Sequence, residues 1–377
     1  MKRVFFMGLA IVLAGLLLLA MRPQTAEAGN GLAGGDYRVL APISHGDLTI
    51  FPVVASKVHD TSDFLTLDEG IRLGDVVVTE VGNIHPMIRR RTPVALPQSG
   101  AQVNRLVLVN NSKHPLILLA GEVVTGGKQD RVVGKDRIVP AESDPVDLSV
   151  FCVEHGRWVE SSTKFDTHAS VMAQPSVRKE AMVSRSQQNV WNEVGNSKSA
   201  MAAKAAPKAA IGGGGGGNYE YAGALRELDS TTSYAKTIEN KAIQKEVDDI
   251  VQPMQKSYES VIKQLRDQNA VGVVVAVKGH IIWADIFASN ALLSKYWPKL
   301  LQSYAAEALT MPGDHSEITG KTAQQFVDNW QTTHEVVESE PGLYRQTEMT
   351  GARFKAFELT SLLPKQNFDV HLSKIAD

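Results

Sequence analysis

The sequence predicts an α+β fold, and two features of the residue pattern lead to this prediction. Between residues 37 and 160, short apolar runs rich in Val, Ile and Leu are separated by Gly, Pro, Asn and Asp, which is typical of strands and turns. Between residues 223 and 310, two long amphipathic patterns flank a hairpin pattern. Because strands and helices are segregated along the chain, the order favours α+β over a parallel α/β sheet.

The segment 37–160 is expected to be mainly antiparallel β. Its predicted strands are residues 48–54, 76–81, 105–110, 116–120 and 147–153. Prolines in the joints between these runs support the assignment, because a proline inside a central strand would remove a ladder hydrogen bond.

The segment 161–222 changes in composition to Ser, Ala, Lys, Asn and Gly. Residues 184–197 have a helical pattern around Trp191. Residues 200–218 are interpreted as an Ala/Lys/Gly-rich insertion that ends in a run of glycines, 212–217. Because such a run has a high chain entropy, we predict a flexible linker there and no phosphate-binding loop.

The segment 223–310 is expected to form a helix, a hairpin and a second helix. Apolar residues at steps of three and four predict the first helix from about Ile243 to Asp267, kinked or split at Pro253. The predicted hairpin turns at Lys278-Gly279. The second helix is capped by Ser289 or Asn290 and kinked at Pro298.

The tail, residues 311–377, is predicted to be a C-terminal extension with two strands, 343–349 and 354–359.

Residues 1–28 have the features of a cleavable secretory signal. Lys2 and Arg3 precede an apolar run over residues 4–21, and the triplet Ala26-Glu27-Ala28 has the small residues that signal peptidase recognises. We therefore predict cleavage before Gly29, export to the periplasm or the extracellular space, and a flexible lead-in over residues 29–36. An uncleaved amino-terminal anchor is the alternative, since the run is about as long as a short spanning helix.

Composition limits the classes of partner. No later apolar run is long enough to span a bilayer, so we expect no membrane association after cleavage. The formal net charge is −2, which gives no reason to expect binding to nucleic acid. The single cysteine, Cys152, excludes an intramolecular disulfide. A small molecule or another protein remains as the expected partner.

A dense group of polar residues follows the strand predicted at 116–120. Glu122 offers a carboxylate for general base catalysis or ligand binding, and Arg131 offers a guanidinium for an anion. Gln129 lies between them, after a Gly126-Gly127 turn whose amides would be able to approach a ligand. The alternative is a structural turn fixed by a Glu–Arg ion pair. The spacing does not match a phosphate-binding Walker A loop.

A second polar group lies at the end of the strand predicted at 147–153. Alternation places Cys152 and Glu154 on one strand face and His155 on the other, so we expect a buried, inert thiol. Arg157 is a second candidate for binding an anionic oxygen. Asp285 lies within an apolar strand pattern, where an acid is either paired internally or exposed at a site.

Motifs for other chemistries are absent from the sequence. The run from His334 to Glu338 lacks the second histidine of a zinc helix motif, and no G-x-S-x-G serine motif occurs. We therefore expect no metal and no cofactor.

Several motifs together resemble one family, the ADP-ribosylglycohydrolase- and rhodanese-phosphatase-superfamily-associated protein domain. The motifs are L-A-G-E at 119–122, G-K-Q-D-R at 127–131, S-V-F-C-V-E-H-G-R-W at 149–158, V-W-N-E-V at 190–194, residues 272–276, A-D-I-F at 284–287, W-P-K-L-L at 297–301 and S-Y at 303–304. They span about residues 45–310. Where the family pattern has Asn after the Gln, this chain has Asp130, and the Ala/Lys/Gly segment resembles an insertion.

The resemblance implies a genomic association with ADP-ribose-processing proteins, and it implies no established activity. The polar set to be tested is Glu122, Gln129, Arg131, Glu154, Arg157 and Asp285. Our first hypothesis is an exported ligand-binding or scaffold domain in which these residues share one pocket. The alternatives are a hydrolase of a nucleotide- or ADP-ribose-like substrate, with Glu122 or Glu154 as base, and a structural protein of the cell envelope.

Overall fold

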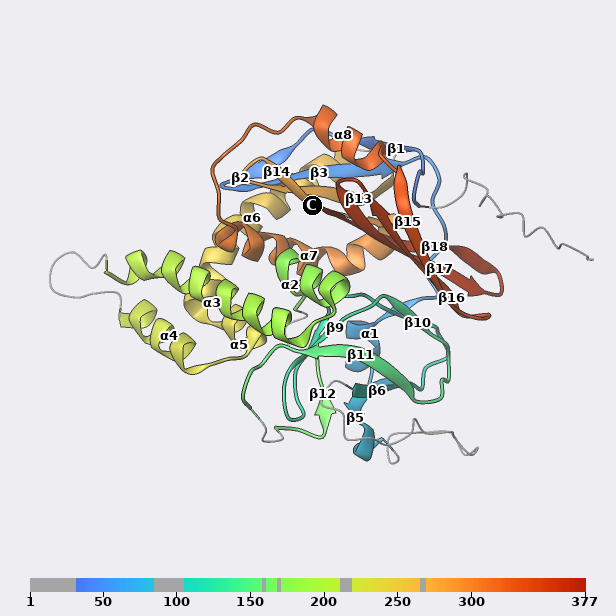
Figure 1. The fold of residues 1–377 in the computed structure, drawn as a ribbon, viewed down its shortest axis with the longest axis horizontal. Helices are drawn as coiled ribbons and strands as arrows, with labels where there is room; N and C mark the ends of the chain where they lie inside the picture. The colour runs from blue at the N-terminus through green and yellow to red at the C-terminus, as the bar shows by residue number, and fades with distance from the viewer. Residues whose placement is uncertain (1–31, 85–104, 158–160, 168–170, 211–218, 265–268) are drawn as a thin grey trace, which may run out of the picture.

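The computed structural model describes residues 32–84, 105–157, 161–167, 171–210, 219–264 and 269–377 (Figure 1). The predicted signal at 1–28 lies outside the described residues. The chain contains both helices and antiparallel sheets, which confirms the predicted α+β class. Within the described ranges, no helix has both the length and the apolar character needed to cross a membrane.

A large antiparallel sheet forms the centre of the described structure. Its order is β1-β3-β13-β14-β18-β17-β16-β15, with β2 paired to β3. The strands are β1 (Tyr37–Val39), β2 (Ile43–His45), β3 (Leu48–Ala55), β13 (Asn269–Val277), β14 (His280–Phe287), β15 (Thr332–Glu340), β16 (Tyr344–Gly351), β17 (Phe354–Leu363) and β18 (Gln366–Ala376). Strands from both ends of the chain therefore build one sheet.

Both faces of the central sheet are covered in its middle. Helices α6 (Lys241–Gln264) and α7 (Asn290–Thr310) lie on one side, and α8 (Gly320–Asp328) lies on the other (Figure 1). Alternation along β13 divides its side chains between the two cores: Val273 and Val275 pack on the α7 side, and Val274 packs on the α8 side. A buried strand of this kind has a continuous apolar pattern, as residues 271–277 do.

A second β unit lies below α7 in Figure 1. One of its sheets has the order β12-β5-β6-β11-β9-β8 and the other has the order β10-β7-β4. The strands are β4 (Leu65–Thr66), β5 (Val76–Glu80), β6 (Arg105–Asn110), β7 (Leu116–Leu118), β8 (Val123–Val124), β9 (Arg131–Val133), β10 (Arg137–Val139), β11 (Val146–Cys152) and β12 (Lys164–Phe165). Helix α1 (Leu67–Arg72) begins with a capping box between Thr66 and Glu69. A 3₁₀ turn spans Val81–Asn83.

The hairpin between β13 and β14 is confirmed, with its turn at Lys278-Gly279. The φ angles of Lys278 and Gly279 are 52° and 80°, and a two-residue hairpin turn requires this pair of left-handed residues. A Cβ on Gly279 would lie 1.8 Å from the carbonyl oxygen of Ser316, so only glycine fits there.

The first part of the predicted insertion, residues 200–210, is helical and not a flexible linker. Those residues continue helix α3 (Gln187–Ala210), which packs against α4 (Tyr219–Ser230). Met201 and Ala205 are buried on one face of α3, and alanine and lysine favour helix. The glycines at 212–217 lie outside the described residues. Helices α2 (Pro175–Lys179) and α5 (Tyr234–Glu239) and a π-helical turn (Glu180–Ser184) complete this region.

The two strands predicted in the tail, 343–349 and 354–359, are confirmed as β16 and β17. The strands on either side of them, β15 and β18, were not predicted, so residues 332–376 form four strands. Strand β18 pairs with β14 inside the central sheet, so this part of the chain is not an extension. Polar residues such as His371 and Ser373 occupy buried positions in β18, and they interrupt its apolar pattern. Strand β15 is exposed on both faces, so it has no apolar alternation. Helices α6 and α7 are not split at Pro253 and Pro298.

Candidate functional site

The six candidate residues lie in three separate places. Glu122 is buried beside α7, and Asp285 is buried in the central sheet. Gln129, Arg131, Glu154 and Arg157 lie around the loop between β8 and β9. The hypothesis that all six share one pocket is therefore wrong, and each place has its own role.

Glu122 is part of a buried ion-pair group that joins the second β unit to α7. Its Oε1 accepts a hydrogen bond of 2.5 Å from Lys299 Nζ, and its Oε2 accepts one of 2.7 Å from the Leu119 amide. Lys299 Nζ also donates to Asp68 on α1 at 2.7 Å. Burial alone would lower the pKa of Lys299, but the charges of Glu122 and Asp68 raise it, so the lysine is charged. These contacts indicate a structural clamp.

Asp285 is completely buried and accepts hydrogen bonds from four side chains. Arg178 binds it in a bidentate manner at 3.0 and 3.2 Å, and Tyr304, Ser373 and His371 donate at 2.5, 2.7 and 3.2 Å. Burial would raise the pKa of Asp285, but the charge of Arg178 and the hydrogen bond from His371 hold it well below the ordinary value. The open question about Asp285 is thus answered: it is paired internally.

The Asp285 network extends through His371 into the second β unit. His371 Nδ1 lies 2.6 Å from Asp136 Oδ2, and Asp136 Oδ1 accepts from the Ala120 amide at 2.7 Å. Burial would lower the pKa of His371, but Asp136 and Asp285 raise it to about 9, so both ring nitrogens donate. The formal charges of Arg178, His371, Asp285 and Asp136 then balance. The L-A-G-E segment supplies contacts to this network and to the Glu122 clamp.

Arg157 joins the two carboxylates of the third place. Its Nε donates to Glu154 at 2.8 Å, its Nη2 lies 3.3 Å from Asp130 Oδ1, and its Nη1 donates to the carbonyl of Gly127. Ser233 Oγ donates to the other Asp130 oxygen at 2.6 Å. The guanidinium is therefore held in a fixed orientation before any ligand arrives.

Gln129 and Arg131 lie beside this group but point into the protein. Arg131 is only 2% exposed, and its Nη1 donates to the carbonyls of Gln129 and Asp130 at 2.5 and 3.3 Å. Burial lowers the pKa of Arg131 and raises that of the neighbouring Cys152 thiol. The Gln129 side-chain amide is buried and has no hydrogen-bond partner among the described residues. These positions make Arg131 unsuitable as a clamp for an external anion.

Gly126 and Gly127 form a turn, as predicted, but their amides donate to other residues of the protein. Gly126 and Gly127 have φ angles of 137° and 49°, and a Cβ on Gly127 would lie 2.3 Å from the Phe165 ring. The Gly126 amide donates to Asp130 and the Gly127 amide donates to the carbonyl of Ser162. The turn thus stabilises the surrounding loops, and its amides are already engaged.

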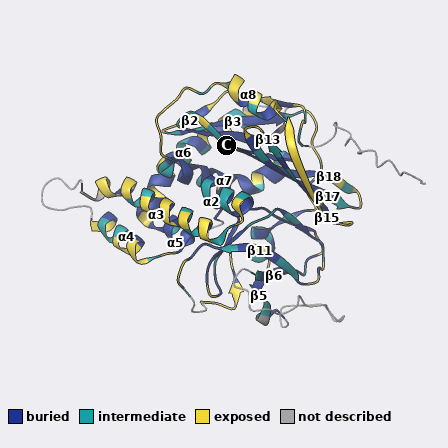
Figure 2. Cartoon of the chain, viewed as in Figure 1, coloured by how far each residue is buried: buried dark blue, intermediate teal, exposed yellow. Residues whose placement is uncertain are grey.

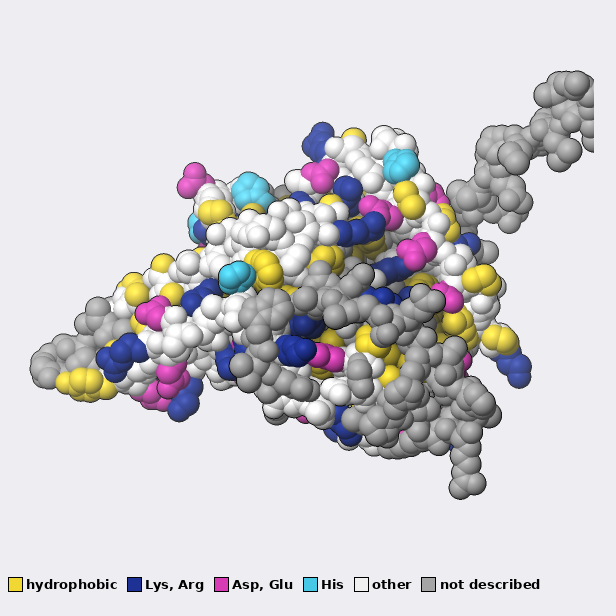
Figure 3. Space-filling view, turned by 60° about the horizontal axis from the view of Figure 1, so that its bottom comes forward, with side chains coloured by type: hydrophobic (Ala, Val, Ile, Leu, Met, Phe, Trp, Pro, Cys, Tyr) yellow, Lys and Arg dark blue, Asp and Glu magenta, His cyan; other side chains and the backbone are white. Residues whose placement is uncertain are grey.

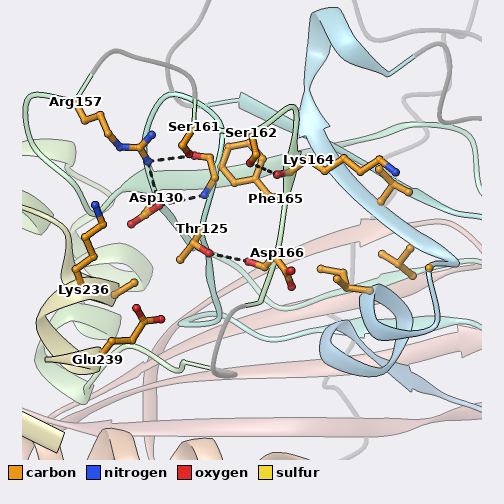
Figure 4. Close-up of a pocket in the computed structure, with 16 residues that line it drawn as sticks. Thr125, Asp130, Arg157, Ser161, Ser162, Lys164, Phe165, Asp166, Lys236 and Glu239 are labelled. Atoms are coloured by element: carbon orange, nitrogen blue, oxygen red, sulfur yellow. Dashed lines mark hydrogen bonds and ion pairs between the residues drawn. The ribbon is translucent and has the colours of Figure 1, made fainter. Parts of the chain in front are cut away.

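Asp130 and Arg157 line a surface hollow of about 590 Å³ (Figure 4). The other polar side chains on its wall come from loops, from β12 and from α5; they are Thr125, Ser161, Ser162, Lys164, Asp166, Lys236 and Glu239. Ile71, Val76, Val77 and Phe165 supply an apolar wall. In the space-filling view, Lys and Arg side chains gather with a carboxylate near the middle of one face (Figure 3). The hollow thus combines both charges, hydroxyls and one apolar side.

A second hollow of about 740 Å³ adjoins the first and shares Arg157, Lys236 and Glu239 with it. Glu154 and His155 line this second hollow. A ligand that crosses from one hollow to the other would pass the fixed guanidinium of Arg157.

Lys236, Glu239, Ser161, Ser162, Lys164 and Asp166 were not identified from the sequence. Lys236 follows the N-cap Ser233, and tertiary contact alone brings α5 to the loop at 126–130. Arg178 and His371 were also missed, because neither lies in a chemical motif. Lys299 was within the W-P-K-L-L motif, and its charge between apolar residues was the available signal.

A pair of carboxylates lies at another place, where the chain enters the central sheet. The amides of Leu32 and Ala33 donate to Asp369 at 3.0 Å and to Glu358 at 2.8 Å. Burial, together with the charge of Asp369, raises the pKa of Glu358 to about 7. Among the described residues, no group of three or more His, Cys, Asp or Glu could hold a metal ion.

The fold and these contacts define an α+β domain with a charged core and an open polar surface groove. The family model of the ARG and Rhodanese-Phosphatase-superfamily-associated Protein domain matches residues 36–375, and the chain belongs to this family. The match confirms the resemblance and includes the four-stranded tail within the domain. No curated protein and no solved structure matches the chain.

Proposed function

We propose that this protein is an exported binding protein whose small polar ligand lies across the two hollows that meet at Arg157. The observation that carries the proposal is the fixed orientation of Arg157 between Glu154 and Asp130, at the junction of both hollows. A guanidinium that is already ordered loses little conformational freedom on binding.

The chemistry of the walls defines the class of ligand. Lys236 and Lys164 are exposed and form no ion pair with the described residues, so they are available for an anionic group. Asp166 and the hydroxyls of Ser161 and Thr125 are suited to hydroxyl or ammonium groups. The wall with Phe165 accepts an apolar part. We expect a small molecule with both charged and apolar parts, and no nucleic acid.

Binding is favoured over hydrolysis by the state of the candidate bases. Glu122 is 1% exposed and paired with Lys299, so it is unsuited to take a proton from an external substrate. Glu154 is 3% exposed, and its Oε2 already accepts from Arg157 and from the Asp130 amide. Neither carboxylate is placed as a free general base.

Replacing Lys236 with alanine is expected to abolish ligand binding and to leave the fold intact. Lys236 is exposed at the junction of both hollows, so the free energy of unfolding should change by less than about 0.5 kcal/mol. A panel of amino acids, sugar phosphates and dicarboxylic acids is screened for compounds that raise the Tm of the wild type. A ligand at about a hundredfold excess over its Kd adds roughly 2.7 kcal/mol to the free energy of unfolding, which raises the Tm.

The matched control is Lys256→Ala, which removes the same charge from the exposed surface of α6, away from both hollows. The control should keep the ligand-dependent rise in Tm, and Lys236→Ala should lose it. If both variants respond like the wild type to every stabilising compound, the ligand does not lie in these hollows.

Export rests on the amino-terminal pattern of charge, apolar run and small-residue triplet. We expect the chain expressed in full in a secreting host to leave the cytoplasm with a mass that corresponds to a start at Gly29. Mass spectrometry of the fractionated cells measures this. A full-length chain in the membrane fraction would support the uncleaved anchor instead.

A further inference from the structure

Strand β15 forms one edge of the central sheet and is open to solvent along its whole length. Its nine residues are all exposed, whereas the neighbouring β16 is mostly buried and exposes one residue, Arg345. Among the described strands, β15 pairs only with β16. Figure 2 shows β15 in the colour of exposed residues, in contrast to the buried strands behind it. Its outer backbone amides and carbonyls have no strand to pair with in the described structure.

The side chains of β15 are unusual for an edge that is only solvated. Val336 and Val337 are 47% and 52% exposed, and they are two of the few large apolar side chains that the described surface exposes. Glu335, Glu338 and Glu340 surround them, and the strand contains no lysine, arginine or proline. Lys135 forms an ion pair with Glu338, while Glu335 and Glu340 have no ion pair among the described residues. The edge therefore presents apolar area between unpaired negative charges.

We propose that β15 is a docking edge for an extended segment of another protein that carries Lys or Arg residues around a small apolar centre. The added segment would continue the sheet through backbone hydrogen bonds, as in strand addition. Its basic side chains would face Glu335 and Glu340, and its apolar residues would cover the two valines. This surface is separate from the hollows at Arg157, so the inference does not depend on the proposed ligand.

Charge decides against a second copy of this chain as the occupant. Two copies of β15 would bring together strands that each carry three glutamates. In an antiparallel pairing centred between Val336 and Val337, Glu335 of one copy would lie opposite Glu338 of the other, twice. Like charges in directly opposite positions destabilise a strand pair.

The test uses a fluorescent peptide as long as β15, with two adjacent valines at its centre and lysines on either side of them, so that each face of the added strand carries a valine and lysines. Its anisotropy is measured with the full protein. We expect saturable binding by the wild type and binding about tenfold weaker or worse for the variant Glu335→Lys/Glu340→Lys, because attraction becomes repulsion at two positions. The control is Asp314→Lys/Glu317→Lys, which reverses two exposed charges in a loop outside the strand and should bind like the wild type.

Two further measurements distinguish strand addition from general attraction. The same peptide methylated on alternate backbone nitrogens should fail to bind, because it cannot complete the ladder. Hydrogen exchange of the amides in residues 332–340 should slow when the unmodified peptide is bound. The proposal is overturned if no peptide binds, if both charge-reversal variants bind equally, if methylation has no effect, or if the protein self-associates through β15 and loses that association in Val336→Lys.

Discussion

Replacement of Asp285 with asparagine is expected to lower the free energy of unfolding by about 3–5 kcal/mol, the cost of removing one partner from a buried ion pair. The two side chains have nearly the same volume, so the change reports the lost charge and not a cavity. Arg178 and His371 would remain as buried cations with only Asp136 to balance them. Urea unfolding near neutral pH measures the difference.

A surface ion pair provides the matched control for this substitution. Asp249 is exposed and lies 3.1 Å from Lys208, so Asp249→Asn should cost less than about 1 kcal/mol. The double variant Asp285→Asn/Arg178→Met should be less destabilised than the sum of its two single changes, because the pair acts as a unit. A loss at Asp285 as small as the loss at Asp249 would contradict the role assigned to this network.

Glu358→Gln is expected to stabilise the protein at mildly alkaline pH and to have no effect in acid. Burial and Asp369 raise the pKa of Glu358 from 4.5 to about 7 in the folded state, so an ionised Glu358 opposes folding. The cost is absent below about pH 4.5, grows as the pH rises towards 7, and is complete above it. A shift of this size corresponds to at most about 3 kcal/mol. Glutamine keeps an acceptor for the Ala33 amide and never carries the charge.

The measurement is the difference in free energy of unfolding between Glu358→Gln and the wild type, followed from about pH 4.5 to about pH 8. Glu317→Gln, in an exposed loop, is the control and should show no such dependence. If the difference between Glu358→Gln and the wild type stays constant with pH, Glu358 does not take up a proton on folding.

The family motifs mainly build the interior of the domain. In L-A-G-E, the Ala120 amide binds Asp136 and Glu122 binds Lys299 of the W-P-K-L-L motif. Gly121 has a φ of 98°, and a Cβ there would lie 2.6 Å from Arg178. Substitutions in these motifs should therefore mainly lower the free energy of unfolding. Of the candidate residues, Arg157 and Glu154 alone line the hollows.

Local periodicity in the sequence was sufficient to predict much of the fold. The strands β3, β5, β6 and β11 lie within a residue or two of the predicted runs, and the hairpin of β13 and β14 turns at Lys278-Gly279 as predicted. In these elements the apolar residues are the buried ones, and a strand can be predicted from periodicity only when this holds. β15 and β18 fail this condition, since β15 is wholly exposed and β18 buries polar groups that are paired with distant residues.

The sequence alone determined the α+β class, the family, and the two polar segments from which Arg157 and Glu154 come. Only the tertiary structure decided which charged residues are interior pairs and which face solvent. The physical reason is that the sign of a charge and its neighbours along the chain do not specify its partner. Asp285 meets Arg178 and His371 across more than 80 residues, and Asp130 meets Ser233 across 103. Residues so far apart in the sequence come into contact only when the whole core is packed.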